Sequence, residues 1–319
     1  MKRFFILASA AIVALASCAK TEVVYKDAPQ EIAFKQVTGA MTKATALTTD
    51  MGVFAYTSDG DPYFVDGSNA AEPKQFEEGT TYWESDPKQY YPLQSALDFV
   101  CYAPYAAGWT YDYANKTMTS ASFTADQIKV TDVLFGAEVY DGCTDDSPVV
   151  LVLFKHALAQ VSVSVKTNVP TVVEITKVTL VGVNRGGELE VDYDGTALNT
   201  VVWNTVTPVT DYSWTGFTSP TTTDAVSCGG AYYFIANNYK DDDPAPDGIN
   251  DYANGCPQTK FVVDYIVNGV EFSAEVSLTG AYWEMGKHYK YTISANLVEI
   301  QFEPTVEVMA TVTPEAIAL

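Results

Sequence analysis

Val161-Ser162-Val163-Ser164-Val165 alternates apolar and hydroxyl side chains, the period-two pattern of a strand with one buried face. The same alternation returns in three later stretches, which are rich in β-branched and aromatic residues that favour strands. No segment keeps a helical period over a useful length, although 93–100 could hold one helical turn. The sequence therefore predicts an all-β protein. The three later stretches are 174–180, 188–193 and 289–293.

Glycine-containing pairs separate the predicted strands and indicate where the chain turns. The strongest signal is Asn268-Gly269 between 261–267 and 270–278, because these two residue types adopt the positive φ angles of a two-residue hairpin turn. Frequent turns between many short strands are typical of sandwiches or barrels. Further turns are predicted at Asp59-Gly60, Asp66-Gly67, Asp141-Gly142, Asn184-Arg185-Gly186-Gly187 and Asp194-Gly195.

Length and a change of pattern divide the chain into segments. A chain of 319 residues is long enough for about two domains, each with its own core. We place the break near Lys155-His156, because polar loops interrupt the strands before it and regular alternation follows it. A strand from 149 to 165 would carry the chain across the break. The predicted segments are a signal peptide (1–17), a tether (18–30), an N-terminal β-sandwich domain (31–155) and a C-terminal β-sandwich domain (156–319).

Composition and charge narrow the classes of partner and activity. Apolar residues make up 47% of the chain and aromatic residues 13%, which excludes a disordered chain. The net charge of -22 repels nucleic acid, so no nucleic-acid partner is expected. His156 and His288 have no obvious nucleophile or carboxylate partner in the sequence, and no Gly-x-Ser-x-Gly motif occurs. We therefore expect that the protein is not an enzyme and that it carries no cofactor.

The first residues have the layout of an export signal. Lys2-Arg3 precedes an apolar run, 4–16, as in secretory signal peptides, and this run is shorter than the ~20 residues that cross a membrane. The run closes on Leu15-Ala16-Ser17-Cys18, which resembles the bacterial lipobox. The resemblance implies cleavage before Cys18 and lipid chains on Cys18 that would hold the protein on a membrane. The alternative is an ordinary signal peptide with an incidental cysteine.

The remaining cysteines leave two states open. Cys101, Cys143, Cys228 and Cys256 allow three disulfide pairings in an oxidising compartment, or they stay free and buried. None forms a Cys-x-x-Cys pair and no histidine lies nearby, so no zinc site is expected.

An acidic segment raises the question of calcium. Residues 241–251 hold the densest group of aspartates in the chain, and Asp-rich loops with a glycine can wrap Ca²⁺. The EF-hand spacing fails here, and a solvated loop explains the same residues. We therefore predict no metal ligand.

A set order of short landmarks runs from Cys18 to the last predicted strands. The landmarks are Ile32-Ala33-Phe34, Thr42-Lys43-Ala44, 52–56, 90–92, 97–104, 132–136, 153–161, 232–235 and 283–291. Together they resemble the fimbrillin family of Bacteroidales, the type V pilins and Mfa-like lipoproteins. The resemblance covers nearly the whole exported chain. It implies two tandem transthyretin-like β-sandwich domains, lipidation at the outer membrane, and assembly with homologous pilin subunits into an adhesive surface fimbria as a stalk or anchor subunit.

The resemblance also implies how such subunits join. Proteolysis removes the first strand of one subunit, and the C-terminal strand of another fills the groove by β-strand addition. On this sequence 31–37 is the candidate for the removable strand and 305–313 for the donor. Alternatively, both are ordinary edge strands of a monomer. The donor residues that would share one face are Val306, Val308, Ala310 and Val312.

The expected cleavage site departs from the family pattern. In the best-known fimbrillins the maturing cut follows an arginine, but no arginine lies between Arg3 and Arg185. Lys43, before Ala44, is the nearest basic residue in the right place. Cleavage there by a trypsin-like protease is the hypothesis. Without that cut, the chain would be an anchor or a surface lipoprotein that never polymerises.

The aromatic residues suggest a second function. Trp83, Trp109, Tyr111 and Tyr113 lie in expected loops of the first domain, and exposed rings stack on sugars. The alternative function is thus a monomeric surface lipoprotein that binds glycan or a host ligand. Packing inside a β-sandwich would explain the same residues.

Overall fold

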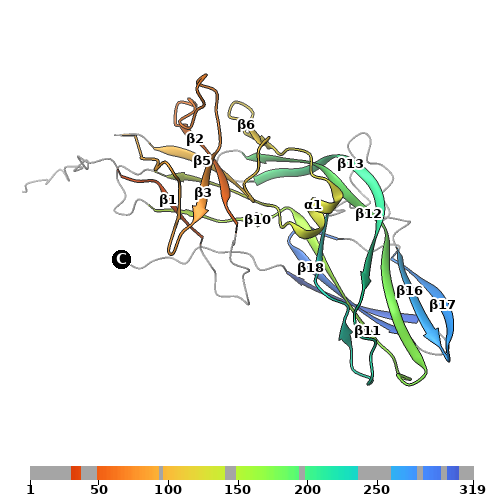
Figure 1. Ribbon diagram of the computed structural model, residues 1–319. Helices are drawn as coiled ribbons and strands as arrows, with labels where there is room; N and C mark the ends of the chain where they lie inside the picture. Colours follow the sequence, from red (N-terminus) through yellow and green to blue (C-terminus); the bar gives the residue numbers. More distant parts are fainter. Residues whose placement is uncertain are drawn as a thin grey trace, which may run out of the picture.

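The structure is a computed structural model, and it describes residues 30–36, 49–92, 96–140, 149–193, 198–235, 260–278, 283–295 and 300–308. Figure 1 shows an elongated molecule built almost wholly from strands, with β1 near one end and the β16–β17 hairpin at the other. The prediction of an all-β protein is confirmed. Among the described residues, no helix is long and apolar enough to cross a membrane.

The elements of the first half are mostly short. They are β1 (Ala33–Gln36), β2 (Met51–Thr57), β3 (Lys74–Glu78), β4 (Trp83–Glu84), β5 (Leu97–Ala103), β6 (Thr110–Asp112), β7 (Thr117–Thr119), α1 (Ala125–Val130), β8 (Leu134–Tyr140), β9 (Val149–Val152) and β10 (Lys155–His156).

The elements of the second half include two long strands. They are β11 (Leu158–Lys166), β12 (Val173–Tyr193), β13 (Leu198–Thr215), β14 (Val226–Ser227), β15 (Tyr232–Ile235), β16 (Lys260–Val267), β17 (Val270–Ser277), β18 (Lys287–Ala295) and β19 (Ile300–Val308).

The first half folds into two facing layers. Its strands follow the order β10-β8-β5-β2-β3-β4-β1-β9. The path turns at β3, where Phe76 pairs with β2 and Glu78 pairs with β4. The layer β10-β8-β5-β2 therefore faces the layer β4-β1-β9, and a shared core fills the space between them.

The β2–β5 layer is buried on both faces. Along β5, Phe99 and Cys101 point into the first core, whereas Val100 and Tyr102 point into a second one, as period-two alternation requires. The second face is covered by β7 and by the near ends of β12 and β13, including Trp203. Strands covered on both sides read as continuous apolar runs, which is why the stretch 97–103 lacks clear alternation.

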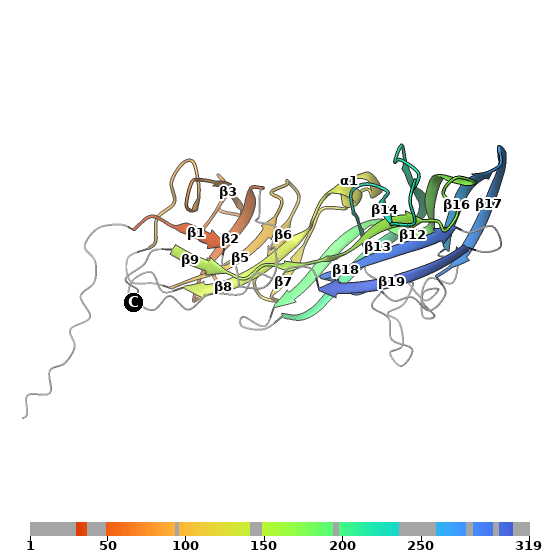
Figure 2. The same cartoon turned by 90° about the horizontal axis from the view of Figure 1, so that it is seen from below.

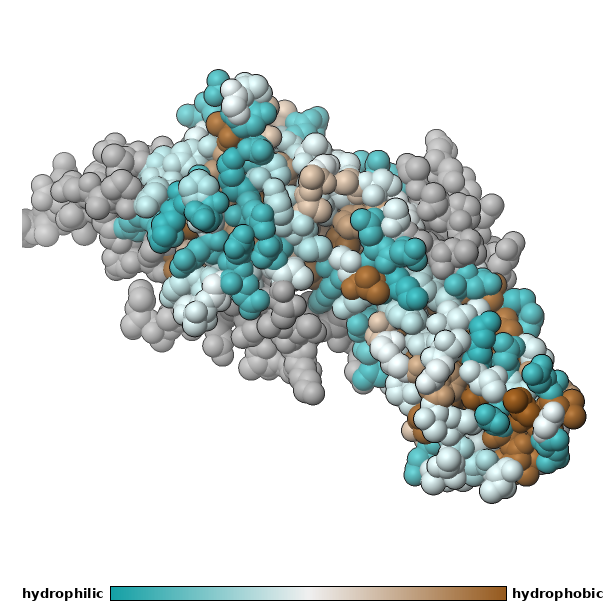
Figure 3. All heavy atoms as spheres, in the orientation of Figure 1, coloured by the Kyte–Doolittle hydropathy of each residue, from teal (hydrophilic) through white to brown (hydrophobic). Residues whose placement is uncertain are grey.

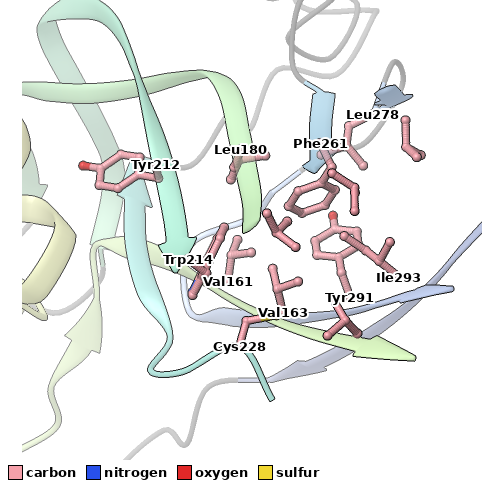
Figure 4. Packing of buried hydrophobic residues seen from close by; sticks show 14 of the residues in the cluster. Val161, Val163, Leu180, Tyr212, Trp214, Cys228, Phe261, Leu278, Tyr291 and Ile293 are labelled. Atoms are coloured by element: carbon pink, nitrogen blue, oxygen red, sulfur yellow. The ribbon is translucent and has the colours of Figure 1, made fainter. Parts of the chain in front are cut away.

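The second half is a sandwich of its own. One sheet has the order β14-β11-β18-β19, with β15 also pairing with β11, and the other contains β17, β16 and β12, with β13 paired to β12. Figure 4 shows Val161 and Val163 of β11 and Ile293 of β18 packed with Phe261 and Trp214 from the opposite sheet.

The long β12–β13 hairpin ties the two halves together. The part of the hairpin formed by 173–183 and 212–214 packs in the C-terminal core. The part formed by 189–193 and Trp203 covers the β2–β5 layer, and residues 190–192 pair with β7 (Figures 1 and 2). The ammonium of Lys129 in α1 adds a contact, 4.3 Å from the Tyr232 ring centroid. Around the predicted break, β10 (Lys155–His156) pairs with β8, and the next strand, β11, belongs to the C-terminal sandwich. One core cluster thus contains residues from both sides of that point.

The turn at Asn268-Gly269 is confirmed. The two residues have φ angles of 51° and 82°, and they join β16 to β17 where Val267 pairs with Val270. Chain turns also occur near Gly60 and Gly67. Asp141-Gly142 and Asp194-Gly195 lie outside the described residues.

The turn predicted at Asn184-Arg185-Gly186-Gly187 is wrong. β12 runs through these residues, and the irregular positions appear as register shifts against β13. Phe123 exchanges two backbone hydrogen bonds with Gly187, of 2.8 and 3.1 Å. A Cβ atom at Gly187 would lie 2.8 Å from the Asn204 carbonyl oxygen, so the glycine permits close approach of two backbones instead of a reversal.

Two smaller predictions also need correction. The described part of 93–100 is strand β5 from Leu97 onward and not a helical turn. The predicted strand from 149 to 165 is three strands, β9, β10 and β11. The helix that does occur, α1, is held by a capping box between Thr124 and Gln127, a short-range signal that apolar periodicity does not detect.

Candidate functional site

The candidate site is the slot that β1 fills in the outer layer of the N-terminal half. β1 lies between β4 and β9, and Phe34 pairs with Trp83 of β4. It runs beside β9 and parallel to it (Figure 2), from Ala33 opposite Val149 to Gln36 opposite Val152. β1 is therefore an interior strand and not an edge strand. The segment 31–37 that the sequence singled out occupies this position, with its last residue outside the described part.

The residues just before β1 extend the pairing. The Ile32 N–H donates to the Gln89 carbonyl at 2.8 Å, and the Tyr91 N–H donates to the Gln30 carbonyl at 2.8 Å. These two bonds flank the Glu31–Tyr90 bridge. One side of the segment is thus bound by 89–91 at residues 30–32 and by β4 at Phe34, and the other side is bound by β9 at residues 33–36.

Two side chains anchor β1 in the core. Ile32 and Phe34 are 0% and 1% exposed. The Phe34 ring meets the Phe76 and Phe99 rings edge-on, with centroids 4.8 and 5.2 Å away. Phe76 belongs to β3 and Phe99 to β5, so Phe34 reaches the opposite layer. Edge-on aromatic pairs add about 0.5–1.5 kcal/mol beyond the area they bury.

The outer side of β1 and of the residues before it is polar, and some of the described polar atoms there have no hydrogen-bond partner. Lys35 is exposed, and Glu31 Oε2 accepts a hydrogen bond from Lys88 Nζ at 2.5 Å. This carboxylate raises the pKa of Lys88 above its usual value. Within the described part of the chain, Gln30 Oε1 and Glu31 Oε1 are buried without a hydrogen-bond partner. The start of β1 therefore carries a desolvation cost that its apolar anchors offset.

The predicted donor strand falls partly inside the C-terminal sandwich. Val306 and Val308 belong to β19, which pairs along its whole length with β18, from Ile300 opposite Ala295 to Val308 opposite Lys287. β19 is the outer strand of its sheet. Ala310 and Val312 lie outside the described residues, as do Cys18, Lys43, Ala44 and the acidic segment 241–251.

The aromatic residues proposed for glycan binding are largely core residues. Trp83 and Trp109 are buried, and Trp109 stacks on Tyr102 with centroids 4.3 Å apart. Tyr111 and Tyr113 are half-buried against Tyr56. The packing interpretation explains them, and buried indoles offer no face to a sugar.

The two described cysteines are buried, and each histidine has a polar partner. Cys101 and Cys228 are free and buried, and burial raises the pKa of the Cys228 thiol to about 12. Cys143 and Cys256 lie outside the described residues. His156 Nδ1 lies 2.9 Å from Asp132 Oδ1, and His288 Nε2 lies 2.9 Å from Ser162 Oγ. Sequence reasoning missed the Asp132 partner, because only the pairing of β10 with β8 brings the two residues together.

The surface shows one further concentration of apolar groups. In Figure 3, brown side chains gather at the end formed by β16 and β17, where Val270 and Phe272 are exposed. The Phe272 ring stacks on Tyr265 at 5.8 Å between centroids. Across the described residues, no group of three or more His, Cys, Asp or Glu side chains is arranged to hold a metal ion.

Solved structures share this fold. A fimbrial protein from Bacteroides vulgatus aligns with a TM-score of 0.59 and 16% identity, covering 88% of this chain and 99% of that one. A candidate cell adhesion protein from Bacteroides uniformis gives 0.53 and 15%, covering 88% and 99%. One from Bacteroides ovatus gives 0.52 and 15%, covering 89% and 98%. At these identities the likeness establishes the fold.

A family model establishes the relationship. No curated protein sequence matches the chain. The fimbrillin-like model matches residues 38–308, which is most of the chain. The match begins just after β1 and ends at the last residue of β19. This family is structural and adhesive and not enzymatic, in agreement with the sequence-based expectation. The chain belongs to the fimbrillin-like family.

Proposed function

We propose that the protein is a structural subunit, stalk or anchor, of an adhesive cell-surface fimbria, assembled by removal of β1 and donation of a strand from the last part of another subunit. Its partners are then homologous pilin subunits. The observation that carries the proposal is the position of β1. A short segment fills the interior of a sheet, so its loss exposes an apolar groove and two unpaired strand edges at once.

The groove that β1 would leave has the properties of a strand acceptor. Its walls offer backbone groups from β9 and from 89–91, and its floor is apolar, formed in part by Phe76 and Phe99. Backbone groups give affinity to an added strand, and alternate side-chain pockets give selectivity. An open edge of this kind is an aggregation hazard, which explains why a precursor would keep it filled.

Maturation and anchoring complete the proposal. A trypsin-like protease would cut after Lys43, between β1 and β2, and leave Ala44 as the new first residue. Lipid on Cys18 would bring the precursor to the outer membrane, where the cut would release the subunit from its anchor. A subunit that is not cut would stay on the membrane at the base of the filament.

Limited proteolysis tests the proposal. The exported chain, starting at Ala19, is treated with trypsin and followed by N-terminal mass analysis and electron microscopy. We expect a new start at Ala44 and filaments whose amount rises with concentration. The Lys43→Gln variant is the matched control and should keep β1 and stay monomeric. A cut that unfolds the first half, or a cut chain that stays monomeric, would contradict the proposal.

A further inference from the structure

Resting on the proposed function, we infer that the residues that enter the β1 slot are 314–319 of a second copy, with Ile317 and Leu319 in the places of Ile32 and Phe34. The chain carries two versions of one short sequence. Pro29-Gln30-Glu31-Ile32-Ala33-Phe34 leads into β1, and Pro314-Glu315-Ala316-Ile317-Ala318-Leu319 follows β19 after a few residues.

The two segments agree at the positions whose side chains are buried in the slot. Ile32 and Phe34 are fully buried, and Ala33 between them is 7% exposed, so the slot demands large, small and large apolar residues in succession. Ile317-Ala318-Leu319 supplies this order. In both segments a proline comes directly before the residue whose carbonyl the slot binds, Gln30 in the first and Glu315 in the second.

The backbone bonds to 89–91 have their counterparts in the second segment. The slot needs an N–H at the position of Ile32, for the Gln89 carbonyl, and a carbonyl at the position of Gln30, for the Tyr91 N–H. Ile317 and Glu315 provide these two groups. In this register Ala318 would lie opposite Val149 of β9, as Ala33 does.

The differences between the two segments affect how tightly each binds. Ala316 replaces Glu31, which removes a buried oxygen without a partner and also the bond to Lys88. Leu319 replaces Phe34 and gives up two edge-on ring contacts. A covalently attached β1 has a high effective concentration in its own slot, so it excludes the incoming segment until it is cut.

We prefer 314–319 to the donor segment predicted from the sequence, 305–313. Residues 305–308 already pair with 287–290 of β18, so they could enter another slot only by breaking that ladder. Segment 314–319 leaves β19 intact. Under this assignment, the β18–β19 ladder of the donor subunit does not have to break.

The test uses the exported chain, 19–319, with a recognition site for a specific protease in place of residues 41–46 and a fluorophore on the β1 side of the cut. Three versions are compared: the unchanged sequence, Ile317→Asp with Leu319→Asp, and the matched control Ala310→Asp with Val312→Asp. Release of labelled β1 and growth of oligomers are measured after cutting. We expect the unchanged chain and the control to release β1 and assemble, and the 317/319 variant to remain a cut monomer with β1 bound.

Four results would overturn the inference. Assembly of the 317/319 variant, or failure of the 310/312 variant alone, would reject segment 314–319 but leave strand donation standing. Failure of all three chains would reject the proposed function itself. As a second measurement, a free peptide of residues 312–319 should block assembly, and its Ile317→Ala form should be about 30-fold weaker, the effect of removing one large aliphatic side chain from a core. Equal potency of the two peptides would also overturn the inference.

Discussion

β1 is the first described strand of the chain and β19 is the last, and the two are held in their sheets in different ways. β1 has a short ladder, but it lies inside a sheet and carries two anchors, Ile32 and Phe34, into the core. β19 has a ladder from Ile300 to Val308, but it lies at the edge of its sheet. The comparison shows that β1 combines a short ladder with two deeply buried anchors, whereas β19 has a longer ladder on one side only.

Pro304 supports the edge position of β19. Proline has no N–H to donate, so within sheets it occurs on edge strands with that side facing outward. It pairs with Tyr291 of β18. Since neighbouring residues point their backbone groups in opposite directions, we expect the Thr305 N–H to point toward β18.

The largest effect is expected at the anchor of β1. Phe34→Ala should lower the free energy of unfolding by about 3–5 kcal/mol, because it removes a buried ring and leaves a cavity. Urea denaturation checks this. Lys35→Ala, next to it and exposed, should stay within about 0.5 kcal/mol. Equal costs for the two variants would show that β1 is not held by its side chains.

The next effect separates the two halves of the molecule. Ile293 of β18 is 0% exposed in the C-terminal core, which shares no member with the core that holds Ile32. Ile293→Ala should cost about 2–5 kcal/mol but leave hydrogen exchange at the Ile32 amide unchanged under conditions where only local opening occurs. Faster exchange at Ile32 under those conditions would mean that the halves are coupled more tightly than their cores indicate.

A smaller effect tests the ladder of β19. Thr305→Pro should cost about 0.5–1.5 kcal/mol, because it removes one backbone hydrogen bond to β18. Thr305→Ala is the control, and thermal melting of both variants gives the difference. No difference between them would place the Thr305 N–H on the open side of the edge.

The smallest effect concerns the Lys88–Glu31 ion pair. The Glu31 carboxylate raises the pKa of Lys88, so the pair's contribution is complete below the usual lysine value of 10.5 and is lost as pH rises through the higher folded value. Lys88→Met should leave the melting temperature nearly unchanged, since Lys88 is exposed. It should slightly accelerate release of cut β1 in low salt and not in high salt. An effect that persists in high salt would contradict an electrostatic origin.

Local patterns in the sequence predicted much of the fold. The alternation in 161–165 and the pair Asn268-Gly269 depend on neighbours along the chain, and both predictions hold. Asn184-Arg185-Gly186-Gly187 was misread because a glycine that admits a close backbone looks the same in sequence as one that turns the chain. Trp83 and Trp109 seemed to lie in loops because their burial depends on distant partners.

The candidate site could be predicted only in part. Segment 31–37 was identified as a removable strand from family resemblance. Its parallel pairing with β9 joins residues more than a hundred positions apart and leaves no local pattern. The same holds for His156 and Asp132, which meet only through strand pairing. The repetition of Pro-x-x-Ile-Ala in 29–33 and 314–318 is visible in the sequence, but its meaning depends on knowing that Ile32 is buried.

Native mass spectrometry of the cut chain at increasing concentration tests the central claim most directly. If β1 and the incoming strand compete for one slot, each added subunit should displace one β1 peptide, so β1 should be missing from all filled interfaces of the oligomers. Oligomers that retain one β1 peptide for every subunit would contradict the account.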